Sequence, residues 1–224
     1  MKYADTVIFI TEADRRRAEE LYPAELAGKR LAVMPICLDV PQDKPSARPI
    51  EGEYALITGS LWFWPNLEGI DWILREVWPA LSERMPQLSL VIAGSRPCDE
   101  LCERLAADRR VFLIDTPADM APYFQHASVY LAPVFDGAGM KVKVAESLSY
   151  GLPLVGTSHV FVGYRDLEDC TAVANTAEEF IEKAIDMLHS DRMQEAKTAA
   201  RQAFLRHYSM DTARRTIADL LETV

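Results

Sequence analysis

Long hydrophobic runs are missing from this sequence of 224 residues. The longest apolar stretches, at 54–64 and 88–94, are far shorter than the roughly 20 residues that a membrane-spanning helix needs. The first residues lead into a short apolar stretch, and an acidic helical pattern follows at once, which is unlike a secretory signal peptide. We therefore expect a cytoplasmic protein, or one that reaches a membrane only peripherally through a further domain.

Positive charge is also scarce. The chain has 24 Lys and Arg residues against 34 Asp and Glu residues, so its formal net charge is −10 at pH 7. Proteins that bind DNA or RNA usually carry a basic surplus, because they neutralise backbone phosphates. We therefore expect no nucleic-acid partner.

Metal-binding patterns are absent as well. The four cysteines and four histidines are scattered, and neither a Cys-x-x-Cys pair nor a His-Glu-x-x-His pattern occurs. A zinc site needs its ligands at such spacings. The sequence therefore predicts free thiols in a reducing compartment, and neither a metal ion nor a cofactor.

Three common nucleotide and hydrolase signatures are missing too. No Gly-x-x-x-x-Gly-Lys-[Ser/Thr] occurs, which excludes a P-loop nucleotide hydrolase. The turn after the strand predicted at 54–58 lacks Gly-x-Gly-x-x-Gly, which argues against a nicotinamide-binding domain. No Gly-x-Ser-x-Gly elbow is present, which argues against an α/β-hydrolase.

A regular alternation of strand and helix patterns begins at residue 54. Short apolar runs predict strands at 54–58, 88–93, 111–114, 128–132, 153–156 and 171–174. Helical patterns are predicted at 67–84 with Asn66 as its cap, and at 97–108, 116–125, 140–150, 176–189, 192–207 and 211–223. Strands that alternate with helices in this way predict an α/β fold with a doubly wound parallel sheet.

The first 50 residues hold less structure. They predict a strand at 6–10, a helix capped by Thr11 that ends near residue 21, and a strand at 30–34. A proline- and charge-rich linker follows at 41–53. Two strands and one helix cannot bury a core alone. We therefore expect residues 1–50 to be an incomplete strand-helix-strand segment with its linker, and residues 51–224 to be a complete domain.

The richest candidate site is the loop at 132–141 and the helix after it. Ligands of open parallel sheets bind beyond the carboxyl ends of the strands. Gly137 and Gly139 let the backbone approach a ligand, and the following helix start favours a phosphate. Lys141 and Lys143 add positive charge, although on one helix they cannot face the same way, so we expect at least one to be solvated. Glu146 can accept both hydrogen bonds of a ribose diol.

Three consecutive aromatic residues, Trp62, Phe63 and Trp64, follow the predicted strand at 54–58. Their loop lies on the ligand side of the sheet, so these rings could stack on a ligand. The alternative is that they pack beneath the loop or against a further domain.

Several segments, in the right order, resemble the C-terminal, donor-binding domain of GT-B glycosyltransferases of family 4 (group 1). The segments are Gly59-Ser60-Leu61 with Pro65-Asn66, Trp78-Pro79, the strand that ends at Gly94, and Gly137-Ala-Gly139 followed by Lys143, Glu146, Gly151 and Pro153. Residues 4–11, and Pro35 with Leu38-Asp39, are similar to the end of the N-terminal domain and the interdomain linker of these enzymes. The resemblance implies a Rossmann-like fold for residues 51–224, with a last helix at about 211–223 that crosses back.

The resemblance also implies donor-binding residues. Glu146 matches the glutamate that binds the nucleotide ribose, and Gly137 and Gly139 match the loop that holds the diphosphate and sugar. Asp136 lies near the position of the acidic residue that contacts the sugar, although its spacing to Glu146 is wider than usual by two residues.

Gly59 and Ser60 match the first donor loop, which in the family often carries an Arg and a Lys that this chain lacks. Lys141, Lys143 or Arg96 could supply that charge. For Arg96, a surface position at a helix start is the alternative.

The resemblance implies glycosyl transfer from a nucleotide-diphosphate sugar to an unidentified acceptor, without a metal ion. The acceptor side of such enzymes lies in the N-terminal domain, so we expect little activity from this chain alone. A separate chain that supplies that half, or a homo-oligomer, would be its partner. The alternatives are a non-catalytic nucleotide-sugar-binding module and an epimerase of the same fold.

Overall fold

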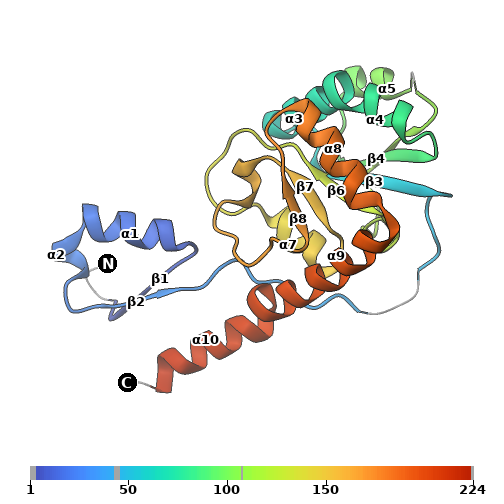
Figure 1. The fold of residues 1–224 in the computed structure, drawn as a ribbon. Helices are drawn as coiled ribbons and strands as arrows, with labels where there is room; N and C mark the ends of the chain where they lie inside the picture. The colour runs from blue at the N-terminus through green and yellow to red at the C-terminus, as the bar shows by residue number, and fades with distance from the viewer. Residues whose placement is uncertain (1–3, 43–45, 107, 223–224) are drawn as a thin grey trace.

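A six-stranded parallel sheet forms the centre of the molecule (Figure 1). The computed structural model describes residues 4–42, 46–106 and 108–222. The sheet has the order β5-β4-β3-β6-β7-β8. Its strands are β3 (Glu53–Ser60), β4 (Leu88–Ser95), β5 (Val111–Asp115), β6 (Val129–Ala132), β7 (Leu154–Gly156) and β8 (Thr171–Val173). The predicted doubly wound α/β fold is therefore confirmed, and the connectivity reverses between β3 and β6.

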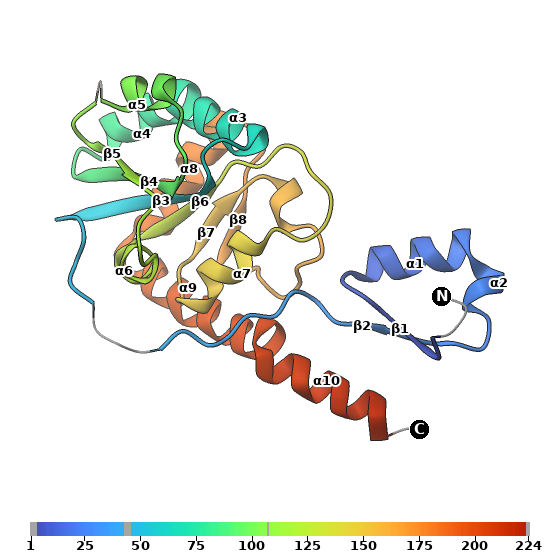
Figure 2. The ribbon, with the colours of Figure 1, turned by 180° about the vertical axis from the view of Figure 1, so that it is seen from behind.

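Helices cover both faces of this sheet (Figures 1 and 2). The helices of this domain are α3 (Trp64–Trp72), α4 (Trp78–Arg84), α5 (Asp99–Leu105), α6 (Ala121–His126), α7 (Val142–Ser149), α8 (Ala177–Leu188), α9 (Ser190–Ala203) and α10 (Met210–Glu222). Side chains of α3, α4, α5 and α8 share one core with the sheet, and side chains of α6 and α7 share the other, while α9 contributes to both.

The side chains of the central strand β3 contribute to both cores. Along it, Ala55 and Ile57 enter the core on one face, whereas Tyr54 and Leu56 enter the core on the other. Successive side chains of a strand point to opposite faces, and a strand covered on both sides is apolar throughout. The continuous apolar run at 54–57 therefore marks a fully buried strand.

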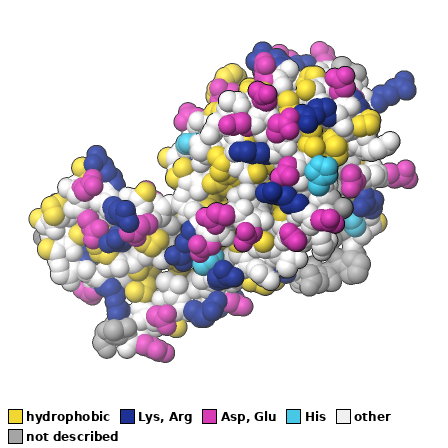
Figure 3. Space-filling model, in the orientation of Figure 1, with side chains coloured by type: hydrophobic (Ala, Val, Ile, Leu, Met, Phe, Trp, Pro, Cys, Tyr) yellow, Lys and Arg dark blue, Asp and Glu magenta, His cyan; other side chains and the backbone are white. Residues whose placement is uncertain are grey.

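The N-terminal segment forms a separate small unit, which Figure 3 shows as a distinct lobe. It consists of β1 (Thr6–Phe9), α1 (Glu12–Leu21), α2 (Pro23–Leu26) and β2 (Arg30–Val33), and β1 and β2 pair in parallel. The Thr11 hydroxyl accepts a hydrogen bond from the Asp14 amide at 3.0 Å, so the predicted cap is confirmed. The short helix α2 was not predicted.

Two backbone hydrogen bonds tie the segment that follows β2 to the larger domain. The amide of Leu38 donates to the Tyr208 carbonyl at 2.8 Å, and the amide of Met210 donates to the Leu38 carbonyl at 2.9 Å. Beyond this point α10 extends below the N-terminal unit in the view of Figure 2. The Arg30 guanidinium of that unit donates to the Leu220 carbonyl of α10.

The first long helix of the large domain differs from its prediction. It begins at Trp64 rather than at residue 67, and a π-helical turn at Ile73–Val77 separates α3 from α4. Asn66 is therefore not its cap. Pro65 starts the helix because proline suits the first turn, where its missing N–H has no helical acceptor.

Other predicted helix bounds were also too wide. α5 covers 99–105 rather than 97–108, and α6 begins at Ala121 rather than at residue 116, because Thr116 lies in the left-handed region at φ 48°. The pattern predicted at 192–207 contains α9, which begins earlier, at Ser190, and a π-helical turn at Phe204–Tyr208. Parts of the predictions fall on residues 43–45, 107 and 223, which lie outside the described residues.

No helix among the described residues is long and apolar enough to cross a membrane.

Candidate functional site

A cleft opens at the carboxyl ends of β3 and β6, where the sheet order reverses. The chain leaves β3 into α3 on one face of the sheet, and it leaves β6 through a loop into α7 on the other face. The cleft encloses about 450 Å³. Its lining residues are Thr58, Gly59, Phe63, Pro65, Asn66, Val134, Asp136, Gly137, Ala138, Met140, Lys141, Val142, Lys143 and Glu146.

Gly59 brings the first wall of the cleft close to its neighbours. Its φ is 150°, and a Cβ at this position would lie 2.6 Å from the side-chain Nδ2 of Asn66. Asn66 Nδ2 donates to the Ser60 carbonyl at 3.0 Å. Glycine at position 59 therefore leaves room for the asparagine side chain against the end of β3.

The second wall is the loop after β6. Gly137 has a φ of 102°, and its amide donates to the Asp136 carboxylate at 2.6 Å. Its carbonyl lies 2.6 Å from His159 Nε2. The Lys141 ammonium donates to the carbonyls of Gly137 at 2.6 Å and Gly139 at 2.9 Å. Lys141 and His159 therefore hold the loop in its shape.

α7 points its first turn at the cleft. Lys141 is its N-cap residue but makes no side-chain capping bond. The Tyr164 hydroxyl donates to the Lys141 carbonyl at 2.8 Å and accepts from the Ala145 amide at 3.2 Å. Tyr164 thus fixes the helix start in place, and the partial positive charge of that start faces the cleft.

Lys143 and Glu146 lie one turn apart on α7, and both are partly buried. The Lys143 ammonium donates to Asn66 Oδ1 at 2.8 Å, which joins α7 to α3 across the cleft. Burial lowers the pKa of Lys143 to about 8, and the charge of Glu146 opposes this shift. Burial likewise raises the pKa of Glu146, and the charge of Lys143 opposes that shift. The cleft therefore holds two ionisable groups that have lost part of their hydration.

A buried hydrogen-bond pair closes the floor. The Tyr130 hydroxyl, on β6, lies 2.8 Å from the Thr58 hydroxyl and accepts from the Thr58 amide at 3.1 Å. Burial raises the pKa of Tyr130 above its usual range. The phenol therefore stays neutral and ties β3 to β6 at the switch point.

Six of the residues predicted for the site line the cleft: Gly59, Asp136, Gly137, Lys141, Lys143 and Glu146. Gly139 belongs to the same loop and accepts a hydrogen bond from Lys141. The structure does not bring Ser60 or Arg96 to the lining. Arg96 is exposed and lies 6.0 Å from the ring centroid of Trp62. A binding role for any of these residues stays a prediction.

The structure bears on two further expectations. Lys141 precedes α7 in extended backbone, and its ammonium bonds the loop carbonyls at a solvent-exposed position, whereas Lys143 is the more buried of the two lysines. Packing beneath the loop is excluded for the aromatic residues, since Trp62, Phe63 and Trp64 are 56%, 48% and 70% exposed.

Sequence reasoning missed three residues whose contacts shape the cleft. Asn66 was assigned to a helix cap, although it links Ser60 to Lys143. His159 and Tyr164 come from the connection between β7 and β8, far along the chain from the loop and helix start that they hold. No local pattern marks such residues, because their partners are distant in sequence.

Among the described residues, no group of three His, Cys, Asp or Glu side chains is placed to hold a metal ion. The described cysteines are free: Cys37, Cys98, Cys102 and Cys170.

The sequence pattern of the family described as Glycosyl transferases group 1 matches residues 52–190. Among curated proteins, the chain is similar to an uncharacterized 44.6 kDa protein in the cps region of Klebsiella pneumoniae. The two are 27% identical over 110 residues, which are 46% of this chain and 28% of that protein.

Solved structures of similar fold include the GtfA/B complex, with a TM-score of 0.74 and 20% identity over 98% of this chain and 45% of that one. They also include Alr3699/HepE from Anabaena in complex with UDP and glucose. Its TM-score is 0.71, at 13% identity over 99% of this chain and 64% of that one. The chain therefore spans less than two thirds of the length of each of these proteins. The predicted family resemblance and the Rossmann-like arrangement are confirmed.

Proposed function

Because this chain belongs to the group 1 glycosyltransferases, we propose that its cleft binds a nucleotide-diphosphate sugar and that the chain supplies the donor half of a glycosyl transfer. The observation that carries this proposal is the meeting of Lys143, Glu146 and the start of α7 at one cleft between β3 and β6. This is the edge of an open parallel sheet at which nucleotides bind.

The diphosphate would lie against the first turn of α7. Backbone N–H groups and the helix dipole favour an anion there, and the Lys143 ammonium adds a full positive charge. As the glycosidic bond breaks, negative charge develops on the leaving diphosphate. Fixed positive groups in a partly dry site stabilise that charge, which is the main contribution we assign to this chain.

Glu146 would accept hydrogen bonds from the two ribose hydroxyls, since an ionised carboxylate has two acceptor oxygens. Asp136 would contact hydroxyls of the transferred sugar from the opposite wall. Lys141 has a different role in this scheme, because its ammonium already binds the loop carbonyls. It holds Gly137 and Gly139 in the shape that admits the donor.

UDP is the first nucleotide to test. Two proteins of similar fold have crystal structures with UDP: Alr3699/HepE with UDP and glucose, and pneumococcal GtfA with UDP and GlcNAc. Groups that bind the reacting end of the acceptor would come from polypeptide beyond the large domain, either a partner chain or a second copy. We further propose that donor binding needs no metal ion, because Lys143 and the start of α7 supply the positive charge, so EDTA should leave the affinity unchanged.

Calorimetry with UDP-, GDP- and ADP-sugars on the wild-type chain and on Glu146→Gln tests this proposal. A hydrogen bond to a charged group contributes about 1.5–3 kcal/mol, so the variant should bind its preferred nucleotide roughly one to two decades more weakly. Glu195→Gln, an exposed glutamate on α9, is the matched control and should bind as the wild type does. Equal affinities for wild type and Glu146→Gln, at equal melting temperatures, would contradict the placement of the donor.

A further inference from the structure

The loop after β3 exposes more aromatic surface than its fold requires. Trp62 is 56% exposed, Phe63 is 48% exposed and Trp64 is 70% exposed. Single exposed apolar residues are common on protein surfaces, but a contiguous group of large ones marks a contact site.

This loop is ordered although its rings are exposed. Leu61, just before the rings, is fully buried, and its amide donates to the Ser95 carbonyl at 2.8 Å. The Phe63 amide donates to the Ser60 carbonyl at 3.2 Å. On the other side of the loop, α3 begins at Trp64. The aromatic rings are therefore presented on a fixed backbone, which lowers the entropy that a ligand must overcome on binding.

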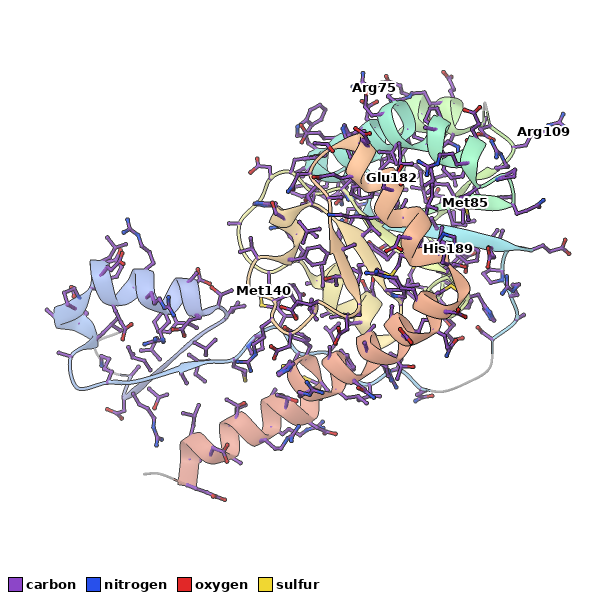
Figure 4. All side chains as sticks on the ribbon, in the orientation of Figure 1. Arg75, Met85, Arg109, Met140, Glu182 and His189 are labelled. Atoms are coloured by element: carbon purple, nitrogen blue, oxygen red, sulfur yellow. The ribbon has the colours of Figure 1, made fainter. Side chains whose placement is uncertain are left out.

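The donor cleft and a second pocket lie on either side of this loop. Phe63 and Pro65 line the donor cleft, whereas Trp64 lines a pocket of about 420 Å³ between α3 and α5. The pocket also contains carboxylates and guanidinium groups, from Glu68, Asp71, Arg75, Glu100 and Arg104. Figure 4 labels Arg75 at the end of the domain where these helices lie.

Some charged side chains of this pocket form ion pairs with one another, and others do not. Asp71 binds Arg75 at 2.9 Å and also pairs with Arg104, so these three side chains hold one another. Glu68 and Glu100 are exposed, and no ion pair within 4.0 Å is found for either among the described residues. The pocket therefore offers an apolar indole wall, free carboxylate acceptors and oriented guanidinium donors.

A sugar ring matches this combination. One face of a pyranose presents C–H groups that pack on an aromatic face, and its rim presents hydroxyls that both donate and accept. The volume is at the lower end of the range for small-ligand sites, roughly 300–1,000 Å³.

Two larger occupants fit less well. Three half-exposed aromatic side chains present roughly 300–400 Å², whereas each partner of a stable protein interface buries about 800 Å². Glu68, Asp71 and Glu100 surround Trp64, and carboxylates at this position repel the anionic surface of a lipid bilayer.

We propose that the pocket between α3 and α5, with Trp64 as its wall, binds a sugar ring of a carbohydrate acceptor at the mouth of the donor cleft. This inference rests on the proposed function, because it gives the acceptor its chemical class and its place. An acceptor chain that lies across Trp64 and Phe63 would extend from the pocket to the cleft.

Titration of the chain with single sugars, followed by NMR in the presence of UDP, tests this inference. The probes are D-glucose, D-galactose, N-acetyl-D-glucosamine and D-glucuronic acid, each raised to concentrations above about 1 mM, where weak binding is measurable. The sequence has four tryptophans, so the spectrum holds four indole N–H signals. At least one sugar should shift the Trp64 signal and the amides of α5, whereas the signal of the buried Trp78 should stay in place.

Variants separate specific binding from adhesion to any exposed ring. Trp64→Ala and Glu100→Gln should each weaken sugar binding at least about tenfold, read from the α5 amides, with unchanged UDP affinity and melting temperature. Tyr22→Ala removes an aromatic ring that is 46% exposed on the N-terminal unit, and it should change nothing.

Several results would overturn the inference while leaving donor binding intact. In the first, UDP binds but none of the four sugars shifts the signals of the pocket. In the second, UDP binds and Trp64→Ala binds sugar as the wild type does. Shifts of Trp64 that appear only with anionic vesicles, or only at raised protein concentration, would assign the patch to a membrane or to a second copy instead. If UDP fails to bind while the sugars bind at Trp64, the proposed function fails together with the acceptor role of the pocket, and only sugar binding at Trp64 stands.

Discussion

The large domain and the N-terminal unit use the same strand-helix-strand pattern, but only the large domain has a core. Tyr54, Leu56 and many other residues of the large domain are fully buried. In the described part of the N-terminal unit, Thr11 and Leu26 alone are buried, and α1 buries none of its residues. The difference teaches that a regular pattern of elements yields stability only when enough layers cover one another.

The N-terminal unit has surface ion pairs in place of a core. Arg15 pairs with Glu12 at 2.5 Å and with Glu19 at 2.9 Å along α1. The hydrogen bond from Arg15 lowers the pKa of Glu12 to about 2. Such exposed pairs contribute little to folding, because water screens them and ordering the side chains costs entropy. These ion pairs therefore do not replace the core that the unit lacks.

The largest expected difference between the two regions lies in substitutions of strand residues. Leu56→Ala should lower the free energy of unfolding by about 2–5 kcal/mol, because it opens a cavity in a fully buried strand. Ile8→Ala, on β1 at 42% exposure, should change it by less than about 0.5 kcal/mol. Urea denaturation followed by circular dichroism measures both. Equal losses would show that the N-terminal unit shares the cooperative core.

The next expected effect is a pH dependence of donor binding. We expect it to come from the large domain alone, without a contribution from the N-terminal unit. All residues that line the donor cleft lie between positions 58 and 146. The pKa of Lys143 is lowered to about 8, so its ammonium loses a proton as the pH rises through that value. A bound diphosphate favours the charged form, so affinity should fall above about pH 8, by up to about tenfold per pH unit.

Calorimetry with UDP across this pH range measures the effect in the full chain and in a chain that starts at Ile36. Both should give the same profile, and Lys143→Arg should flatten it because a guanidinium stays charged. Lys197→Arg on α9, another lysine whose pKa burial lowers, is the control and should keep the wild-type profile. A profile that changes on removal of the first 35 residues would show that the N-terminal unit takes part in donor binding.

The smallest effect compares the same cap substitution in both regions. Thr176 forms a full capping box with Glu179 at the start of α8, and Thr11 caps α1. Thr176→Ala should lower the global free energy of unfolding by about 1 kcal/mol. Thr11→Ala should leave that value unchanged and speed amide exchange in α1 alone, as hydrogen-exchange mass spectrometry would show. Global destabilisation by both variants would mean that the two regions unfold together.

Elements whose local pattern agrees with their burial were predictable from the sequence. The apolar strand at β3, the cap at Thr11 and the glycine turn at 137–139 each rest on residues close together in the chain. The start of α3 was not predictable in this way, because Asn66 suits a helix cap but binds Ser60 and Lys143 across the cleft instead. Its tertiary partners outweigh its local preference.

The amino-acid sequence by itself determined the alternation of elements, the parallel sheet and the loop that carries Gly137, Lys143 and Glu146, because spacing and residue type act locally. The tertiary structure alone decided what each of those side chains does. It placed the Lys141 ammonium on loop carbonyls, removed enough water from Lys143 to lower its pKa, and left Trp64 exposed beside a polar pocket. Hydration and hydrogen-bond partners depend on which distant segments pack together, and no local pattern encodes that arrangement.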